Sequence, residues 1–141
     1  MHSTTTTTSQ LGIEIPVGPA HVRVCPPARH DARRPTVIAI DGEIDASNIH
    51  DISALTQEIL SAQSDVVIDL SDVTFMAARG LSTLTELPER ARSHGIGCAV
   101  VTSPAIDHLL DVVDRQRPVW VYYTADSALD AVEVEGLWRN Y

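Results

Sequence analysis

Residues 65–81 constrain the fold more than any other segment of this chain. The segment opens with the β-branched apolar run from Asp65 to Leu70, which is typical of a buried strand. Ser71 and Asp72 predict a turn after that strand, and a helix is expected to begin near Ala78. The first backbone N–H groups of a helix have no partner inside the helix, so a helix start is a natural place for an anion or a protein partner. The segment therefore predicts a strand–turn–helix unit and makes the helix start the first candidate site.

Strands and helices alternate along most of the chain. Strands are predicted at residues 21–25, 36–40, 65–70, 97–101 and 119–123, and helices behind Asn48, at 78–93, behind Ser103 and from Asp126 or Ser127. The first of these helices has apolar residues at the 3–4 spacing of an amphipathic helix, and Pro88 is expected to kink the second. This order predicts an α/β domain with about four helices.

The hydrophobic periodicity that predicts strands and helices is weaker at the two ends of the chain. Thr4 to Thr8 form a low-complexity polar run, which cannot bury enough apolar surface to offset its ordering entropy. Residues 1–20 are therefore expected to be a disordered or loosely ordered tail, although the loose alternation from Leu11 to Val17 leaves open a short edge strand. The folded domain is predicted at residues 21–132, and residues 133–141 are predicted to be a C-terminal tail.

Length and charge narrow the choice of function. A chain of 141 residues predicts one domain and can bury a sizeable core without disulfides. The formal net charge is −9, and most of the acidic residues fall within residues 36–132. An acidic body repels a phosphate backbone, so nucleic acid is not an expected partner and a basic protein surface is favoured.

No pattern of catalytic or metal-binding residues stands out in the sequence. Cys25 and Cys98 are isolated, and the apolar run around Cys98 predicts that it is buried. The six histidines lack ligand spacing, and Asp69 and Asp72 are interpreted as turn and capping residues rather than as a pair for acid–base or magnesium chemistry. We therefore expect no catalytic residue, no metal and no cofactor. Without a signal peptide or a bilayer-spanning apolar stretch in the sequence, a soluble cytoplasmic protein is expected.

Three short motifs occur in order along the chain: Gly42-Glu43-Ile44-Asp45, then Asp72-Val73-Thr74-Phe75-Met76 followed by Gly80-Leu81, and finally Pro104 to Asp111. Together they resemble the STAS domain family, the anti-sigma factor antagonists. The first is similar to the family's Gly-Glu-Leu-Asp after the second strand. The second is similar to the residues around the family's phosphorylated serine, and the third to Pro-Ala-Val-x-x-Leu-Phe-Asp on the third helix.

This resemblance implies a STAS-like fold, in which a sheet of four to five strands has its helices packed mainly on one face. It also implies a non-enzymatic regulatory protein that binds an anti-sigma factor or a related serine kinase. The implied partner-binding residues are Asp45, Phe75, Met76, Ala77, Ala78, Arg79 and Gly80. In the family, phosphorylation of a serine at the position of Ala78 switches binding off, and the position of Asp45 carries a carboxylate that docks a partner's arginine. Ala78 has no hydroxyl and cannot accept a phosphate.

The departure from the family motif at Ala77-Ala78-Arg79 leaves several functions open. The protein is either an antagonist without serine-phosphorylation control at the usual position or a diverged scaffold that has lost the partnership. The alternative is an accessory or ligand-sensing STAS domain of a lipid or anion transport system. Arg79 opposes the helix macrodipole by about 0.3–1 kcal/mol, so either a partner acid or a bound anion offsets it, or its side chain extends into water. The sequence also leaves open whether the chain forms a homodimer.

Overall fold

The computed structural model describes residues 12–27, 34–61, 65–113, 121–122 and 126–132. Within these ranges, six strands form one sheet in the order β1-β2-β3-β4-β5-β6. The strands are β1 (Ile13–Val17), β2 (Ala20–Cys25), β3 (Thr36–Ile44), β4 (Val66–Met76), β5 (Cys98–Val101) and β6 (Val121–Tyr122). The helices are α2 (Ile49–Leu60), α3 (Ala78–Ser93), α4 (Pro104–Val113) and a further helix at residues 126–132. The predicted α/β order is confirmed.

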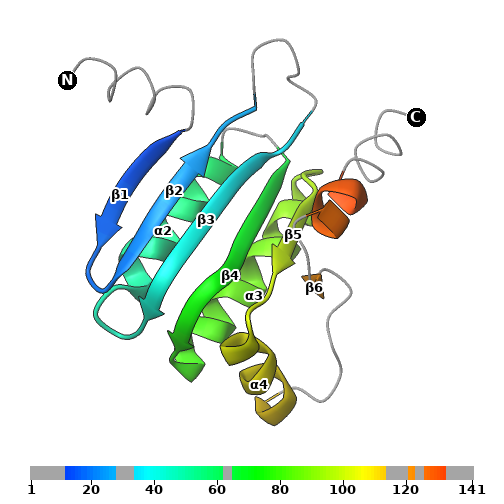
Figure 1. Ribbon diagram of the computed structural model, residues 1–141. Helices are drawn as coiled ribbons and strands as arrows, with labels where there is room; N and C mark the ends of the chain where they lie inside the picture. Colours follow the sequence, from blue (N-terminus) through cyan, green and yellow to red (C-terminus); the bar gives the residue numbers. More distant parts are fainter. Residues whose placement is uncertain (1–11, 28–33, 62–64, 114–120, 123–125, 133–141) are drawn as a thin grey trace, which may run out of the picture.

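The sheet is antiparallel at one edge and parallel across the rest. β1, β2 and β3 pair antiparallel, whereas β3, β4, β5 and β6 pair parallel. Parallel neighbours need a long crossover, and α2, α3 and α4 supply the crossovers between β3 and β6. As a result, the carboxyl ends of β3 and β4 lie at one end of the sheet, next to the turn that joins β1 to β2 (Figure 1).

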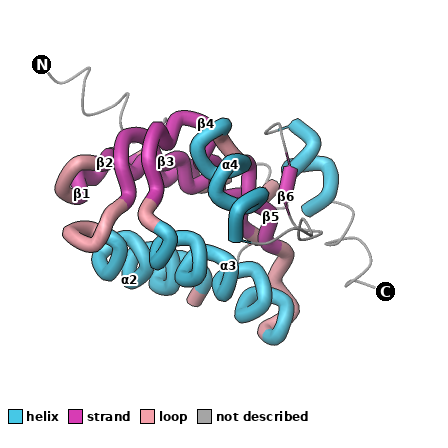
Figure 2. The backbone as a smooth tube through the Cα atoms, turned by 90° about the horizontal axis from the view of Figure 1, so that it is seen from below, coloured by secondary structure: helices cyan, strands magenta, loops and turns pink. Residues whose placement is uncertain are grey.

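The main core lies between the sheet and the pair of helices α2 and α3, which run side by side across one face (Figure 2). The buried residues of α2 follow the spacing of an amphipathic helix: Ile49, Ile52, Thr56 and Leu60. α4 adds Ile106 and Leu110 to the same core. On the opposite face, the helix at residues 126–132 packs Ala128 and Val132 against Val67, Ala99 and Val101. The prediction that the helices pack mainly on one face is confirmed.

Three strands differ in extent from the sequence prediction, and the first is β3, which was predicted at residues 36–40 and continues to Ile44. Residues 13–17, part of the expected tail, form the edge strand that the sequence left open, so the sheet has six strands rather than four or five. β4 does not turn at Ser71 and Asp72 but continues to Met76. Its register against β3 shifts twice, which lets the strand absorb extra residues and keep pairing. Ser71 and Asp72 are consequently both exposed in the strand.

Several local predictions hold. α3 begins at Ala78, and the Ile106 N–H donates to Ser103 Oγ at 3.3 Å, so Ser103 caps α4. Cys98 is buried as predicted. Asp69 and Asp72, interpreted as turn and capping residues, instead lie within β4, where Asp69 Oδ1 accepts the Ser71 N–H at 3.0 Å. In the described part of the chain, every helix is too short or too polar to cross a membrane. The predicted C-terminal tail and the threonine run lie outside the described residues.

Candidate functional site

The loops that follow β3 and β4 lie side by side. Ile44 at the end of β3 is in register with Met76 at the end of β4. The Ala77 N–H donates to the Ile44 carbonyl at 2.9 Å and joins the two strand ends just before α3 begins. Asp45 and Ala78, far apart in the sequence, therefore emerge at the same end of the sheet. Ligands and partners of parallel sheets bind outside such carboxyl ends.

The start of α3 has an unusual cap. Ala77 occupies the N-cap position with extended backbone, φ −69° and ψ 148°, and makes no side-chain capping bond. Ser, Thr, Asp or Asn is preferred at this position because its side chain can accept a helical N–H. The Gly80 N–H donates to the Ala77 carbonyl at 2.8 Å, and Ala78, the first helical residue, is exposed. The helix start thus presents two methyl groups where a polar cap would ordinarily stand.

Gly80 allows α3 to approach α2 and the strand ends closely. A Cβ atom at position 80 would lie 3.2 Å from Met76 Cγ, 3.4 Å from Ile44 Cγ2 and 3.5 Å from Ile49 Cδ1. Gly80 and Met76 are both buried, and Met76 belongs to the main core. These two residues pack in the core beneath the start of α3, so their role is to position the exposed residues beside them.

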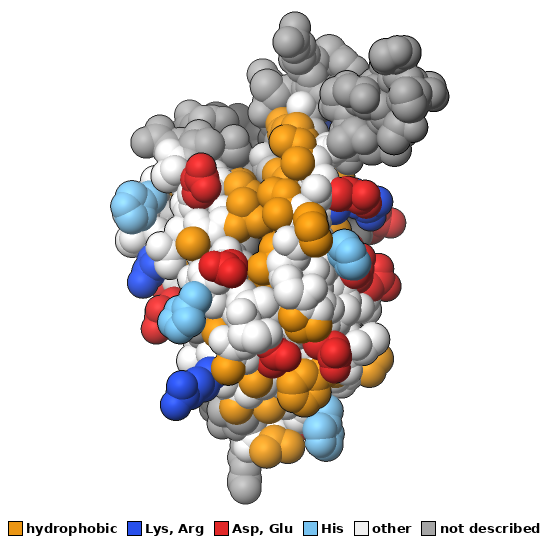
Figure 3. Space-filling model, turned by 90° about the vertical axis from the view of Figure 1, so that its left-hand side faces the viewer, with side chains coloured by type: hydrophobic (Ala, Val, Ile, Leu, Met, Phe, Trp, Pro, Cys, Tyr) orange, Lys and Arg blue, Asp and Glu red, His pale blue; other side chains and the backbone are white. Residues whose placement is uncertain are grey.

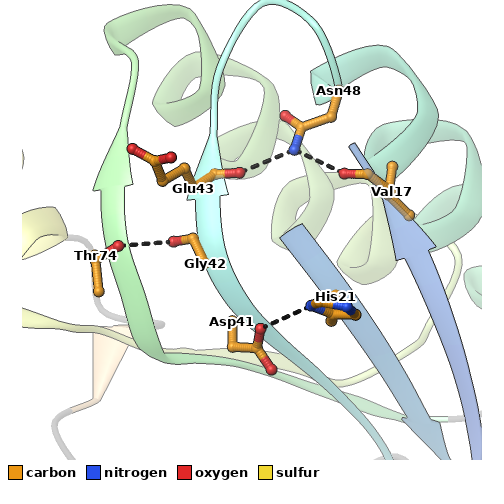
Figure 4. Close-up of polar contacts among 7 residues, drawn as sticks. All are labelled: Val17, His21, Asp41, Gly42, Glu43, Asn48 and Thr74. Atoms are coloured by element: carbon orange, nitrogen blue, oxygen red, sulfur yellow. Dashed lines mark hydrogen bonds and ion pairs between the residues drawn. The ribbon is translucent and has the colours of Figure 1, made fainter. Parts of the chain in front are cut away.

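The end of β4 turns Phe75 outward. After the second register shift, Phe75 lies opposite Glu43, and its side chain is 48% exposed. The Thr74 hydroxyl donates to the Gly42 carbonyl at 3.2 Å and ties this part of β4 to β3 (Figure 4). Strand irregularities often redirect side chains next to functional sites. Here the irregularity puts a large apolar side chain in water beside the start of α3.

Asp45 is half-buried in the loop behind β3. Its Oδ1 accepts both the hydroxyl and, at 2.9 Å, the backbone N–H of Ser47. These bonds, the hydroxyl first, hold the pKa of Asp45 below its ordinary value of 3.8 and outweigh the opposing effect of desolvation. The Asp45 carboxylate is therefore ionised throughout the physiological range and can attract a partner cation.

Asn48 organises this end of the sheet, although sequence reasoning marked it only as a helix-cap candidate. The side chain is 1% exposed, and its Nδ2 donates to the Val17 carbonyl at 3.0 Å and to the Glu43 carbonyl at 2.9 Å (Figure 4). Its Oδ1 accepts the Asp45 N–H at 2.9 Å. One amide thus joins β1, β3 and the loop that carries Asp45. It makes no capping bond to α2, and the sequence held no signal for partners so far away.

The seven predicted site residues lie at one end of the sheet but differ in access. Phe75, Ala78 and Arg79 are exposed, Asp45 and Ala77 are half-buried, and Met76 and Gly80 are buried. The five accessible residues are called the candidate surface below. Its chemistry is apolar at Phe75 and Ala78, with an ionised carboxylate at Asp45 and a guanidinium at Arg79, so it suits a protein partner better than a reacting small molecule.

Known proteins share this fold and parts of this sequence. The STAS domain family model matches residues 27–128. Osmosensory protein A of Mycobacterium tuberculosis is 38% identical over 71 residues, which are 50% of this chain and 45% of that protein. The matched part of this chain thus spans less than half the length of that curated relative.

Solved structures of anti-sigma factor antagonists have the same fold. The crystal structure of such an antagonist from Mycobacterium paratuberculosis superposes with a TM-score of 0.63 at 26% identity, covering 85% of this chain and 98% of that one. The antagonist SpoIIAA in its unphosphorylated form gives a TM-score of 0.57 at 16% identity, covering 80% of this chain and 96% of the other, a likeness of fold alone. Because the family model covers more than half of the sequence, this chain belongs to the STAS domain family.

Proposed function

We propose that this STAS domain is a non-enzymatic anti-sigma factor antagonist, which binds an anti-sigma factor or a related serine kinase through the candidate surface. The observation that carries the proposal is the exposure of Ala78 at the first residue of α3, at the same end of the sheet as the ionised Asp45. The antagonist from Mycobacterium paratuberculosis, 26% identical to this chain, supports the same function.

Binding would combine an apolar contact with a charged one. Phe75 exposes about half of its side chain, and large aromatic side chains that fill a partner pocket often dominate protein interfaces. Asp45 is held in place by Ser47, so it can pair with a partner arginine at little cost in side-chain entropy. An anti-sigma factor occupied in this way is unavailable to its sigma factor, which is competition by protein–protein binding.

In the proposed function, binding of the partner is not controlled by serine phosphorylation at the start of α3. Ala77, Ala78 and Arg79 have no hydroxyl, and the first hydroxyls further along α3, Ser82 and Thr83, follow one helical turn later. The amount of free anti-sigma factor would then depend on the concentration and affinity of this domain rather than on a kinase acting at the helix start.

The test begins with capture of partners by the tagged protein from its native lysate, identified by mass spectrometry. Each captured protein is then purified and titrated against the domain by calorimetry. A saturable complex with an anti-sigma factor of kinase-like ATPase fold supports the proposal. A saturable complex with transporter subunits supports a transport accessory domain instead, and the absence of any saturable complex supports a diverged scaffold.

The site is tested by Ala78→Asp, with Ala54→Asp on the exposed face of α2 as the matched control. An acid at the start of a helix is locally stabilising, by about 0.3–1 kcal/mol, so the first variant should fold. Its carboxylate would be desolvated against the partner next to Phe75, which should weaken binding at least about tenfold. Equal affinities for wild type and Ala78→Asp would exclude this surface as the dock.

A further inference from the structure

The turn between β1 and β2 lies at the same end of the sheet as the candidate surface (Figure 1). Val17 pairs with Ala20, so only Gly18 and Pro19 form the turn, and both are exposed. Gly18 has φ +60°, the left-handed backbone that tight hairpins of this length require. β1 and β2 both precede residue 27, where the family match begins, so this turn is additional to the matched segment.

Three contacts fix the turn to the end of β3. The Glu43 N–H donates to the Pro19 carbonyl at 3.2 Å. The same carbonyl sits against Gly42, where a Cβ atom would come within 2.4 Å of it, so only glycine fits at this position. The buried Asn48 amide holds the Val17 carbonyl just before the turn. An exposed turn anchored on both sides in this way is a rigid surface feature.

The turn also adjoins the loop that carries Asp45. A Cβ atom at Gly18 would lie 3.4 Å from Asn48 Cβ and 3.8 Å from Ser47 Oγ, and Ser47 is the residue that binds the Asp45 carboxylate. The turn therefore adjoins the loop that contains Ser47 and Asp45, and the turn and this loop together are called the ridge below. On the β1 side of the molecule, apolar side chains form a band with acidic, histidine and arginine side chains on either side of it (Figure 3).

Several carboxylates lie near this ridge, whereas the candidate surface carries its one guanidinium at Arg79 in the first turn of α3. Glu43 is exposed one residue before Ile44, and Asp41, whose side chain is 59% exposed, lies in register with the exposed Asp72. Asp41 also pairs with His21 at 3.4 Å, but such an exposed pair is easily displaced. A segment rich in arginine or lysine would therefore be drawn to this side of the candidate surface.

We propose that the turn formed by Gly18 and Pro19 is a second wall of the docking surface, which selects anti-sigma partners that carry a basic segment beside their contact with Phe75 and Ala78. This inference rests on the proposed function. The carboxylates of Asp45 and Glu43 attract the basic segment, and the rigid, uncharged turn packs against its aliphatic stems without losing conformational entropy.

The test uses the anti-sigma factor identified by capture and three variants at Pro19. Each keeps the position 19 carbonyl, so the bond from Glu43 and the contact with Gly42 remain available. Pro19→Lys should weaken binding about 3- to 10-fold because it repels a basic segment a few ångströms away. Pro19→Glu should bind as tightly as wild type or up to about 3-fold more tightly, and Pro19→Ala should bind within about 2-fold of wild type. The difference between the lysine and glutamate variants should shrink in 0.5 M salt, since screening is stronger there.

Ala54→Lys, at the exposed site on α2, controls for a change in net charge alone. An NMR titration of the wild type supplies a readout that needs no variant, because the amides of Gly18 and Ala20 should shift together with that of Ala78. If the wild type binds and the Pro19→Lys and Pro19→Glu variants bind equally well, or if the turn amides do not shift, the inference is overturned while the proposed function stands. If the wild type binds no anti-sigma factor, the proposed function fails and this inference with it.

Discussion

Replacing Asn48 by alanine should lower the free energy of unfolding by about 3 kcal/mol, since three hydrogen bonds are lost at roughly 1 kcal/mol each. The bonds join the Asn48 amide to the carbonyls of Val17 and Glu43 and to the N–H of Asp45. The side chain is only 1% exposed, so water cannot readily replace it. For a domain of this size, about 3 kcal/mol corresponds to a fall in melting temperature of roughly 10 °C.

Asn48→Asp keeps the shape of the side chain, so its effect on stability reports the loss of the N–H donors and the added charge rather than a change in packing. An oxygen would then face the carbonyls of Val17 and Glu43, so burial and electrostatic repulsion should raise the folded-state pKa of the introduced carboxyl. A carboxyl with a raised folded-state pKa destabilises the protein only where the unfolded chain is ionised, above about pH 4. The extra loss should therefore be absent at lower pH and grow as the pH rises toward 7.

The assay is urea unfolding followed by circular dichroism at 25 °C, with Ser71→Ala as the control. Ser71 is exposed on β4, so its replacement should change the free energy of unfolding by less than about 0.5 kcal/mol. A loss below about 1 kcal/mol for Asn48→Ala, at an unchanged urea slope, would refute the conclusion that this amide holds the hairpin on the domain.

Three further outcomes are expected. Incubation with a partner kinase and ATP should add no phosphate to Ala77-Ala78-Arg79; intact-mass analysis checks this, and a phosphate mapped to Ser82 or Thr83 would mean that control has moved. Ser47→Ala should raise the pKa of Asp45 toward its ordinary value, because the largest stabilising bond to the carboxylate is lost; carboxyl NMR titration measures the shift, and an unchanged pKa would contradict the assignment. Removal of residues 1–18 should lower the melting temperature by about 5 °C or more, since β1 and the buried Val17 are lost; a change within about 2 °C would mean that β1 adds little stability.

The central elements were predictable because their signals are local. The periodicity of α2, the β-branched run of β4 and the cap at Ser103 each depend on residues within one or two turns of chain. The same signals marked the helix start at Ala78 as a candidate site, whereas Asp45 and the other residues of the candidate surface were implied by the resemblance to the STAS family. The structure brings the two loops together because β3 and β4 pair parallel and end at the same edge of the sheet.

The remaining features depend on partners far away in the sequence. β1 is short and contains Pro16, which lowers its strand signal but is tolerated at a sheet edge, where one side of the strand needs no N–H donor. The extension of β4 through Ser71 and Asp72 depends on continued pairing with β3 across two register shifts. The bond from Asn48 to Val17 spans 31 residues, and no local pattern could reveal it.

The residues by which this chain resembles its family divide according to burial. Ile44, Met76, Gly80 and Leu81 are buried where the strand ends meet α2 and α3, so packing alone requires them. They would persist in a domain that had lost every partner. Phe75, half-exposed in water, has no such packing requirement, and neither has the ionised Asp45. If the proposed function holds, partner binding would be decided at Phe75, Asp45 and Ala78, and a substitution at Met76 or Gly80 that abolished binding would report only on the fold.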